Sequence, residues 1–570
     1  MKKAKTLVLV LLALTVGVGV LLKIAFRAPQ PPGHQIFING NILTMDANNT
    51  IVQALSTRGN LIEALGTTDE LMARATEDTE VVDLRGRTML PGFIDAHGHF
   101  PGSGLRVIAA DLNSPPIGQR QTMADVLTAL KTQAAKTPEG DWVSGFGYDD
   151  TLLKEHRHPT RQELDSVSTE HPVVAMHVSG HMLVANSRAL ALVGIDASTP
   201  DPEGGVIGRE PDSQEPNGLL EETARLGVVR QMQNMSLTDT YRLIKAAAVE
   251  YAQVGVTTAQ SGGVSKELAT GLSWFSKLGV IPQRLVLFPF ETEFGEALLN
   301  GDYDPADYNS DKVVMGAVKL VADGSIQGYT GYLSEPYFTP YHGDAEYRGY
   351  PAIPREKLFK QVEALHKAGY QIAVHGNGDE AIEDILDAFE AAQQAYPVED
   401  PRMILIHAQM ARQDQLARMK KLGITPSFFT AHTWYWGDRH RDIFLGPERA
   451  SRISPSKSAL DLGLRFSSHL DTPVTPMLPL QAVWSQVFRI TTGGDVLGPE
   501  ERIDVMQALR AVTIDAAWQV FQEGNRGSLE PGKYADLVVL SGNPLDEPMR
   551  MRDLQVERTV IGGATVFKAN

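Results

Sequence analysis

Two histidines, His97 and His99, end an apolar run in the segment PGFIDAHGHF. On a β-strand, side chains two residues apart point to the same face. A strand that carries both imidazoles at its C-terminal tip therefore offers two neutral nitrogen ligands to one metal ion. A pair this short also arises by chance, so the rest of the sequence must supply the other ligands of a metal site.

Further apolar runs contain side chains of the types that metal chemistry needs: Lys319, His375, His407 and Asp471. If these runs are strands of one barrel, their C-terminal ends lie at the rim where barrel enzymes keep their active sites. Neutral imidazoles hold a Lewis-acidic cation such as Zn²⁺, which makes hydroxide available at neutral pH. A carboxylate opposite that cation can take a proton from water and pass it to a departing amine. Asp471 is the candidate for this catalytic role.

Each of these residues also has an ordinary structural explanation. His375 and His407 can be hydrogen-bonded histidines of the core. Lys319 can form a buried ion pair with Asp323, and Asp471 can cap the helix that follows the Asp-Thr-Pro turn. Together, however, these explanations require several independent polar intrusions into apolar strands at the same end of a barrel. A shared site is therefore the favoured interpretation.

The composition excludes some classes of function. The chain has 570 residues, a formal net charge of −17 and no cysteine. This acidic balance disfavours nucleic acid as a partner. Without cysteine there are no disulfides, no lipoprotein attachment and no thiolate ligands, so nitrogen and oxygen atoms must hold any metal. The expected partner is a small-molecule substrate, and formation of a homo-oligomer is left open.

The N-terminal segment has the pattern of a membrane anchor or a signal peptide. Lys2, Lys3 and Lys5 precede an uncharged apolar run over residues 6–22. At about 1.5 Å per residue, this run reaches roughly 26 Å, slightly short of the ~30 Å hydrocarbon core. No small-x-small cleavage site follows cleanly, so residues 1–33 are expected to form an uncleaved inner-membrane anchor and a linker. The catalytic part is then expected in the periplasm or outside the cell, with secretion after cleavage as the alternative.

Apolar runs and helical stretches alternate through the middle of the chain. Runs such as RLVLFPF, QIAVHGNG and RMILIHAQ are separated by stretches with a 3.6-residue apolar period, such as EKLFKQVEALHKAG. Eight such units predict an α/β protein with a (β/α)8 TIM-like barrel over residues 92–525. The stretch over about 101–218 is expected to be an insertion after the first barrel strand. Short strands in residues 34–91 and 526–570 predict a composite β-sandwich from both ends of the chain.

The chain resembles the amidohydrolase superfamily, and most closely its YtcJ-like branch. The resemblance covers roughly residues 35–567 and rests on the ordered motifs VVDLRGRTMLPGFIDAHGHF, HMLVANSRAL, VKLVADGSIQGYTG, AVHGNGDEAI, ILIHAQM, HLDTPV and LEPGKYADLVVL. It implies a barrel with a composite β-sandwich. It also implies a site with one or two divalent ions, expected to be Zn, that hydrolyses C–N bonds in amides or related groups.

The resemblance also implies a role for each candidate metal ligand. The set is His97, His99, Lys319, His375, His407 and Asp471. The first two histidines would bind the more buried ion, the two later ones the more exposed ion, and the aspartate would act as ligand and base. Lys319 matches a lysine that many relatives carboxylate and use to bridge two ions, whereas an unmodified lysine is a poor ligand and favours a single ion. For His469, two residues before the aspartate, a contact to a ligand and a place in the pocket wall are both left open.

Five residues are predicted to bind substrate: His181, Asn186, Tyr329, Trp434 and Trp436. The first two match family positions near the site. The three aromatic residues suit an apolar or aromatic substrate group, although they also suit packing of the insertion onto the barrel. The sequence thus predicts a metal-dependent hydrolase of a non-peptide amide bond. The alternatives are an ester or lactone hydrolase with the same site, and a non-catalytic anchored protein that binds or senses a ligand.

Overall fold

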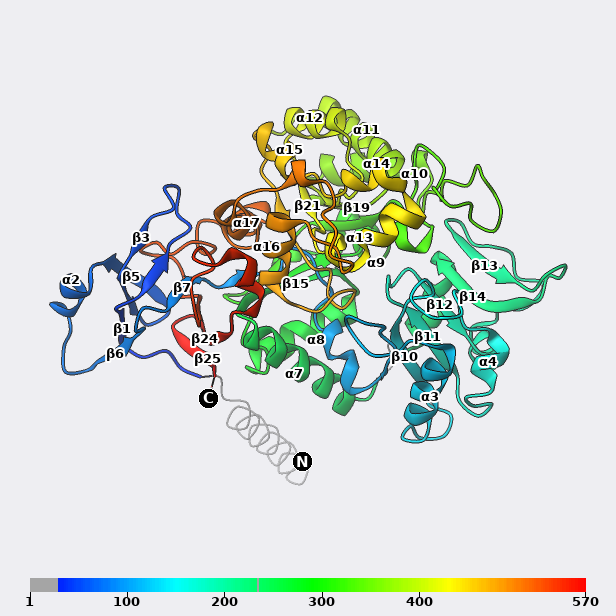
Figure 1. Cartoon of the computed structure of the whole chain (residues 1–570), viewed down its shortest axis with the longest axis horizontal. Helices are drawn as coiled ribbons and strands as arrows, with labels where there is room; N and C mark the ends of the chain where they lie inside the picture. The colour runs from blue at the N-terminus through cyan, green and yellow to red at the C-terminus, as the bar shows by residue number, and fades with distance from the viewer. Residues whose placement is uncertain (1–28, 233–234, 570) are drawn as a thin grey trace, which may run out of the picture.

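The computed structural model of the chain describes residues 29–232 and 235–569, and Figure 1 shows it as three adjoining parts. Strands from both ends of the chain lie on the left, the strand–helix body in the middle, and the insertion on the right. The predicted membrane anchor falls in residues 1–28, outside the described residues. In the part that is described, none of the helices combines the length and the apolar character needed to cross a bilayer.

Two parallel sheets form the centre of the body. One has the strand order β17-β16-β15-β8 and the other β18-β19-β20-β21-β22. Their strands are β8 (Phe93–Ile94), β15 (Val256–Val264), β16 (Arg284–Pro289), β17 (Val313–Met315), β18 (Val318–Val321), β19 (Ile372–Gly376), β20 (Met403–His407), β21 (Ile424–Phe428) and β22 (Ser467–Ser468). Parallel strands that alternate with helices make a TIM-barrel-like α/β fold, as predicted.

The predicted closed barrel does not appear as one continuous ladder in the described residues. β17 pairs with β16 and β18 pairs with β19, and Gly316 and Ala317 interrupt the chain between the two. β8 and β22, at the other junction, have two residues each, which is too short for a regular ladder. The sheets nevertheless meet at both junctions. Phe290 forms a parallel bridge with Lys319, and the Asp471 N–H donates to the His97 carbonyl at 3.1 Å.

Helices connect and surround these strands, and several of them are amphipathic. They are α7 (Leu237–Gln253), α8 (Lys266–Lys277), α9 (Glu291–Asn300), α10 (Arg355–Lys367), α11 (Asp379–Ala395), α12 (Gln413–Leu422), α13 (His432–Arg439), α14 (Gly446–Ser451), α15 (Ser456–Asp461), α16 (Pro479–Phe488), α17 (Val505–Ala511) and α18 (Ile514–Gln519). α11 is typical: Ile382, Ile385 and Phe389 are buried at the three- and four-residue spacing of one helix face. Burial of that face against β19 and β20 stabilises the helix more than its intrinsic propensity does.

The insertion forms a sheet of its own, with the order β13-β14-β12-β11-β10-β9. Its elements are β9 (Ala110–Asp111), α3 (Met123–Ala134), β10 (Val143–Tyr148), α4 (Arg161–Asp165), β11 (Val173–His177), β12 (Met182–Ala185), α5 (Ser187–Val193), β13 (Gly205–Arg209), β14 (Pro216–Glu222) and α6 (Leu226–Met232). Leu130, Val143 and Leu164 belong to a hydrophobic cluster separate from that of the body. The insertion therefore has its own core, and β11 and β12 carry its hairpin toward the body.

Strands from the two ends of the chain share one sheet. Its order is β25-β24-β23-β7-β2-β3, and a second sheet has the order β5-β4-β1-β6. The strands are β1 (His34–Ile38), β2 (Asn41–Leu43), β3 (Ile51–Val52), β4 (Ala54–Arg58), β5 (Leu61–Gly66), β6 (Thr79–Asp83), β7 (Thr88–Pro91), β23 (Leu537–Leu540), β24 (Val556–Ile561) and β25 (Ala564–Lys568), with α2 (Thr68–Met72) after β5. Phe37 and Leu55 from one sheet and Val539 from the other lie in one apolar cluster. The predicted domain boundaries stay predictions.

A buried ion pair joins the body to the C-terminal strands. The Arg284 guanidinium, at the start of β16, donates to the Asp536 carboxylate at 2.7 Å and 3.3 Å. Both side chains are 4% exposed. The same carboxylate accepts the Gly562 N–H at 2.7 Å, and the guanidinium lies 3.5 Å from the ring centre of Tyr534. A buried guanidinium has no water to replace a lost partner, so this contact is expected to be costly to break.

We expect Asp536→Ala to lower the free energy of unfolding by about 3–5 kcal/mol, because it leaves the Arg284 charge buried and unpaired. Denaturant unfolding followed by circular dichroism measures this loss. The control is Glu547→Ala, which breaks an exposed 3.4 Å pair with Arg550 and should cost no more than about 0.5 kcal/mol. A loss below about 1 kcal/mol for Asp536→Ala would contradict this role.

Candidate metal centre

Two strand ends bring three of the predicted ligands together. His97 and His99 follow β8, and Asp471 follows β22. The Asp471 Oδ1 atom lies 3.3 Å from His99 Nε2 and 3.7 Å from His97 Nε2. One ligand atom from each of the three residues lies within 4.8 Å of the others, a spacing that one metal ion can span.

The other predicted ligands adjoin this group. Lys319, on β18, places Nζ 3.5 Å from His97 Nε2. His407, at the end of β20, places Nε2 3.9 Å from Asp471 Oδ2. The His375 ring, on β19, is centred 4.5 Å from the His407 ring. The structure therefore gathers all six residues together. Five of them end or follow parallel strands, whereas Lys319 is the second residue of β18. Their roles as ligands stay a prediction.

Two of these residues have unusual backbone conformations. His407 has a φ of 69° and Asp471 a φ of 52°, both in the left-handed region. Such a conformation costs a residue other than glycine on the order of 1 kcal/mol, and it persists only where the surrounding structure enforces it. Both residues are buried at strand ends, where the bend turns their side chains toward the shared pocket.

Neighbouring polar groups orient two of the imidazoles. Gln260 Oε1 lies 3.0 Å from His97 Nδ1. An amide oxygen can only accept, so Nδ1 carries the proton and the Nε2 lone pair faces the pocket. His407 Nδ1 lies 2.9 Å from His469 Nε2, and His469 Nδ1 lies 2.9 Å from Ser427 Oγ. His469 thus contacts a predicted ligand. Gln260 was not among the predicted site residues, although its polar side chain within the buried strand β15 was a usable signal.

Asp323 fixes His375 and not Lys319. It accepts the backbone N–H groups of Tyr332, Asn377 and Gly378 at 2.8–3.0 Å, and its Oδ1 lies 3.4 Å from His375 Nδ1. A β-carbon on Gly378 would lie 1.9 Å from the Tyr332 carbonyl, so only glycine fits this turn. Burial raises the pKa of Asp323 to about 7. The ordinary explanation of Lys319 as the ion-pair partner of Asp323 is therefore wrong. Backbone N–H groups already donate to the oxygen atoms of that carboxylate.

Burial sets the charge state of the pocket. It holds the pKa of each of the buried imidazoles His97, His375 and His407 well below the usual value, and neighbouring cationic groups add to this. Burial also lowers the pKa of Lys319 to about 7, although Asp471 opposes the shift. Burial alone would raise the pKa of Asp471, but hydrogen bonding and charge from His99 hold it below its usual range. The pocket thus offers neutral nitrogen atoms and one ionised carboxylate.

This donor set fits a divalent cation. Among the described residues, the buried atom Asp471 Oδ1 has no well-aligned hydrogen-bond partner, although His99 Nε2 lies 3.3 Å away. Buried polar atoms without partners are costly and rare in folded proteins. Imidazole nitrogen and carboxylate oxygen, without thiolate, suit Zn²⁺ or a similar first-row ion. The residues that would hold such an ion are the six predicted from the sequence.

The insertion contributes a further imidazole. His181, between β11 and β12, has its ring centred 5.0 Å from that of His375. Its Nδ1 lies 2.8 Å from Oε2 of the buried Glu222, at the end of β14. Glu222 was not singled out from the sequence. The pair of glutamates that ends the apolar run GLLEE was a weak signal for it, since a carboxylate is seldom buried without a partner.

One predicted substrate contact has a structural role instead. Asn186 accepts the N–H groups of Val173 and Ala189 and donates to the carbonyls of Ser168 and His171. These four bonds use its full hydrogen-bonding capacity and cap α5, so the prediction of a substrate contact is corrected.

Trp434 packs within the body, and its predicted contact with substrate stays a prediction. Its ring packs edge-on to Trp484 at 5.4 Å, and the Arg552 guanidinium lies 4.4 Å from its centre. These contacts join α13 to α16 and to the C-terminal segment, so the indole stabilises the packing of the body.

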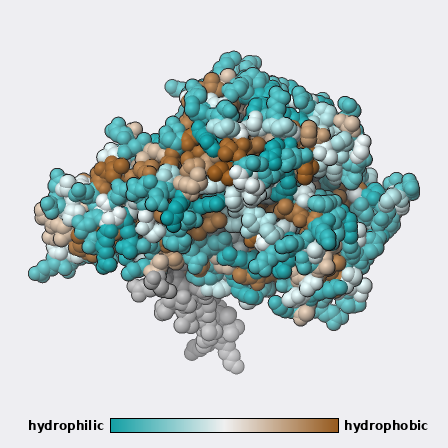
Figure 2. Space-filling view, in the orientation of Figure 1, coloured by the Kyte–Doolittle hydropathy of each residue, from teal (hydrophilic) through white to brown (hydrophobic). Residues whose placement is uncertain are grey.

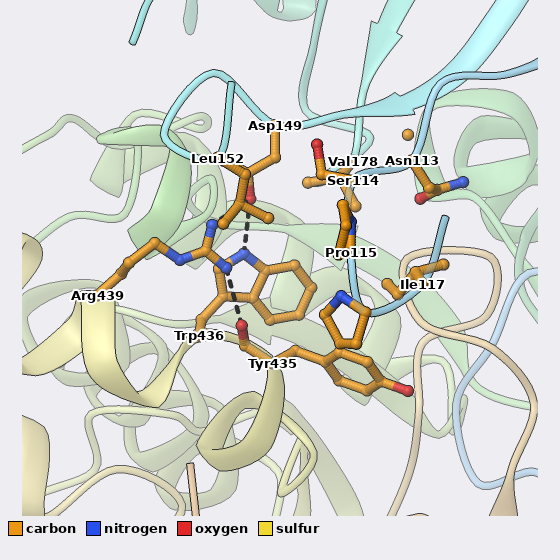
Figure 3. Close-up of a pocket in the computed structure, with 12 residues that line it drawn as sticks. Asn113, Ser114, Pro115, Ile117, Asp149, Leu152, Val178, Tyr435, Trp436 and Arg439 are labelled. Atoms are coloured by element: carbon orange, nitrogen blue, oxygen red, sulfur yellow. Dashed lines mark hydrogen bonds and ion pairs between the residues drawn. The ribbon is translucent and has the colours of Figure 1, made fainter. Parts of the chain in front are cut away.

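The two remaining aromatic candidates stand where the body meets the insertion. Tyr329 stacks on Tyr341, with ring centres 4.6 Å apart. The Trp436 indole N–H donates to Asp149 Oδ2 at 3.0 Å, and Figure 3 shows this ring beside Arg439 in a small pocket between α13 and the insertion. Their predicted contact with substrate stays a prediction.

Comparisons with known proteins agree with this picture. The model of the amidohydrolase family matches residues 80–567. The N-substituted formamide deformylase of Arthrobacter pascens is 31% identical over 542 residues, which cover 94% of this chain and 98% of that protein. YtcJ of Bacillus subtilis (strain 168) is 28% identical over 552 residues, with 94% and 99% covered.

Solved structures show the same fold. An uncharacterized metal-dependent hydrolase from Pyrococcus furiosus superposes with a TM-score of 0.70 at 24% identity, over 90% of this chain and all of that one. Its counterpart from Pyrococcus horikoshii OT3 has a TM-score of 0.71, also at 24% identity, with 90% and 98% covered. The family match over residues 80–567 and the relatives above together identify the family of this chain. The chain belongs to the amidohydrolase family, in the branch that includes YtcJ, and is a metal-dependent hydrolase of carbon–nitrogen bonds other than peptide bonds.

Proposed function

We propose that this enzyme hydrolyses the amide bond of a small N-substituted molecule, with Asp471 as the proton acceptor. The observation that carries the proposal is the position of the ionised Asp471 carboxylate, within 4 Å of the Nε2 atoms of His97, His99 and His407. The similarity to a protein named N-substituted formamide deformylase supports an amide with a small acyl group. The Tyr329 stack and Trp436 at the border of the insertion suit an apolar group on the amide nitrogen.

The imidazoles of His97, His99, His375 and His407 would hold the metal, together with Asp471. A bound divalent ion supplies Lewis acidity, which acidifies water and polarises an amide carbonyl. Gln260 and His469 keep the nitrogen atoms of two imidazoles aimed into the pocket. A divalent metal is supported by the donor set, and Zn is our proposal for its identity.

Asp471 would move the proton. Its charged form is favoured by His99, so it is ready to accept a proton at neutral pH. Burial keeps bulk water from competing for that proton. After accepting it at a carboxylate oxygen, Asp471 would donate it to the nitrogen of the departing amine, as a general base that becomes a general acid.

We further propose that Lys319 is carboxylated and bridges two ions. Its pKa of about 7 leaves much of the amine uncharged at neutral pH, and the uncharged amine is the form that reacts with carbon dioxide. The resulting carbamate would add a second oxygen ligand beside His97. With an unmodified Lys319, the site would hold a single ion.

The proposed site requires that the two parallel sheets act as one frame. We infer that they are the two arcs of a (β/α)8 barrel, closed at Phe290–Lys319 on one side and at His97–Asp471 on the other. We likewise infer that the two terminal sheets pack as a composite sandwich around their shared apolar cluster. Both inferences follow the expected architecture, in which active-site residues converge at the C-terminal rim.

We expect the purified enzyme to contain one or two divalent ions per chain, and His97→Ala to lose at least one of them together with turnover. Removing one neutral nitrogen ligand weakens the site strongly, because the remaining ligands cannot complete the coordination. Elemental analysis of the purified protein measures the ion content.

The control for this variant is His156→Asn. His156 is exposed and has a φ of 47°, a conformation that asparagine tolerates. It should keep both metal and activity. Full metal content in His97→Ala would remove this histidine from the ligand set.

We expect Asp471→Asn to lower kcat by at least about 10³-fold, because the amide cannot accept the proton that the carboxylate accepts. The assay uses N-benzylformamide, N-butylformamide and the matched formate esters. Amide hydrolysis by the wild type with weaker ester hydrolysis supports the proposal, and ester hydrolysis alone would overturn it. Unchanged turnover by Asp471→Asn with normal metal content would show that another group is the base.

We expect enzyme prepared in ¹³C-bicarbonate to show a carbamate signal by ¹³C NMR, and Lys319→Gln to lack that signal and to bind a single ion. The glutamine cannot form a carbamate, so the bridge is lost. Lys312→Gln is the control, because Lys312 precedes β17 and lies near Arg284 and Asp536, apart from the candidate ligands. Two ions and an unchanged spectrum in Lys319→Gln would contradict the bridge.

A further inference from the structure

A series of buried polar side chains leads from the candidate ligand His407 to α18, and we call it the His407–Gln519 network. Its members, in order, are His407, His469, Ser427, Ser467 and Gln519. The successive contacts are 2.9, 2.9, 2.8 and 2.7 Å long. Hydrophilic side chains cover most of the face shown in Figure 2, whereas these five are at most 3% exposed. Bulk water therefore does not compete for their hydrogen bonds.

The far end of this network has one orientation. Gln519 Nε2 donates to the Pro426 carbonyl at 3.1 Å and to Thr425 Oγ1 at 2.9 Å. The Thr425 hydroxyl in turn donates to the Arg465 carbonyl at 2.9 Å. Exchanging the nitrogen and oxygen of the Gln519 amide would place its oxygen against the Pro426 carbonyl, where both atoms can only accept. Gln519 Oε1 therefore faces Ser467 as an acceptor.

This orientation sets the direction of the hydrogen bonds between the serines. The Ser467 hydroxyl has one proton, and Gln519 Oε1, 2.7 Å away, requires it. The proton between the two serines must then come from Ser427, whose oxygen lies 2.8 Å from Ser467 Oγ. Because Ser427 has given its own proton away, its oxygen accepts from His469 Nδ1.

The direction continues through the two imidazoles. Burial lowers the pKa of His469 to about 3, so this ring carries a single proton at neutral pH. With that proton on Nδ1, His469 Nε2 accepts the proton of His407 Nδ1. His407 is then left with a lone pair on Nε2, which lies 3.9 Å from Asp471 Oδ2 in the pocket. A neutral imidazole with this free nitrogen is the form that binds a metal ion.

Without Gln519, the opposite direction would be favoured. A proton on His407 Nε2 would face the carboxylate of Asp471, which is a strong acceptor. If Ser467 donated to Ser427, every later group could donate onward and deliver a proton to that nitrogen. Such a reversal leaves Gln519 Oε1 buried without a donor, which is costly. Gln519 thus opposes the tautomer that would block a metal ion.

We propose that Gln519 is a positioning residue that keeps the Nε2 lone pair of His407 directed at the candidate metal centre through the His407–Gln519 network. The proposal rests on the proposed function in one respect, namely that His407 is a metal ligand. Gln519 acts from a distance: its contacts with Thr425 and Pro426 place it near the start of β21, whereas His407 ends β20.

The first test is a competition titration of the full-length protein with Zn²⁺ and a chelator. We expect Gln519→Met to lower the affinity for zinc by about five- to tenfold, because the reversed network then satisfies every donor and the competent tautomer becomes the minor one. Ser467→Ala should have the same effect, since Ser427 is then free to donate to His469. It serves alone if Gln519→Met does not fold. Affinities within about twofold of the wild type, with unchanged tautomers, would overturn the proposal.

The double variant separates action through the network from local damage. Gln519→Met added to Ser467→Ala should change the affinity for zinc by less than about twofold, because the connection is already cut. Losses that multiply would overturn the proposal. Gln283→Met is the matched control: Gln283 is also a buried glutamine, which donates to the Ala248 carbonyl at 2.8 Å. An equal loss of zinc affinity in this control would likewise contradict the role of Gln519.

The second test observes the tautomer of His407 directly. Nitrogen NMR of the full-length protein, labelled with ¹⁵N-histidine and stripped of metal, distinguishes protonated from unprotonated ring nitrogens. The His407 signals are assigned by their loss in His407→Gln. We expect a protonated Nδ1 and a free Nε2 in the wild type, and the reverse in Gln519→Met. Gln283→Met should keep the wild-type pattern.

The two measurements together separate this proposal from the proposed function. A change of tautomer in Gln519→Met with unchanged zinc affinity would support the role of Gln519 and remove His407 from the proposed ligand set. A loss of zinc affinity with an unchanged tautomer would overturn the role of Gln519 and leave the proposed metal centre standing.

Discussion

One ionised carboxylate, Asp471, is held in a buried pocket beside three imidazoles and a lysine. A buried charge is costly unless something balances it. Here burial itself suppresses protonation of the deep imidazoles, so they do not balance the charge as full ion-pair partners. The arrangement is an incomplete electrostatic pair, and a bound cation would complete it. The missing positive charge is seen at Asp471 Oδ1, a buried atom that has no well-aligned hydrogen bond in the described part of the chain.

Such a pocket requires a rigid scaffold around it. Parallel strands with both faces buried supply this rigidity, because their backbone groups pair with one another and their side chains are packed on all sides. The left-handed conformations of His407 and Asp471 show that the scaffold overrides local preference at two strand ends. Left-handed residues also occur elsewhere in the described chain, but these two lie at the pocket. The backbone N–H groups around Asp323 hold that carboxylate beside His375. They lie in a turn where only a glycine can approach the Tyr332 carbonyl.

Much of this arrangement could be predicted from the sequence because its signals are local. Apolar runs that end in histidine, such as ILIH, place a ligand at a strand end without knowledge of the partner strand, and His97, His375 and His407 are found there. Contacts between distant segments could not be predicted in that way. Gln260 meets His97 across 163 residues, and Glu222 meets His181 across 41. Asn186 was misassigned because a helix cap and a substrate contact both call for a polar side chain at a strand–helix junction. The closure of the barrel depends on short strands whose pairing no periodicity reveals.

These constraints imply that the body and the insertion differ in how freely their residues can vary. The pocket of candidate ligands is expected to tolerate little variation, since His97 and His407 are each held by a buried partner. The insertion has its own core, so its hairpin can change without disturbing the strands that carry the ligands. Through that hairpin, His181 packs against His375. Under the proposed function, a substitution in the insertion would alter what reaches the pocket, whereas a substitution in the ligand-bearing strands would alter whether the pocket works at all.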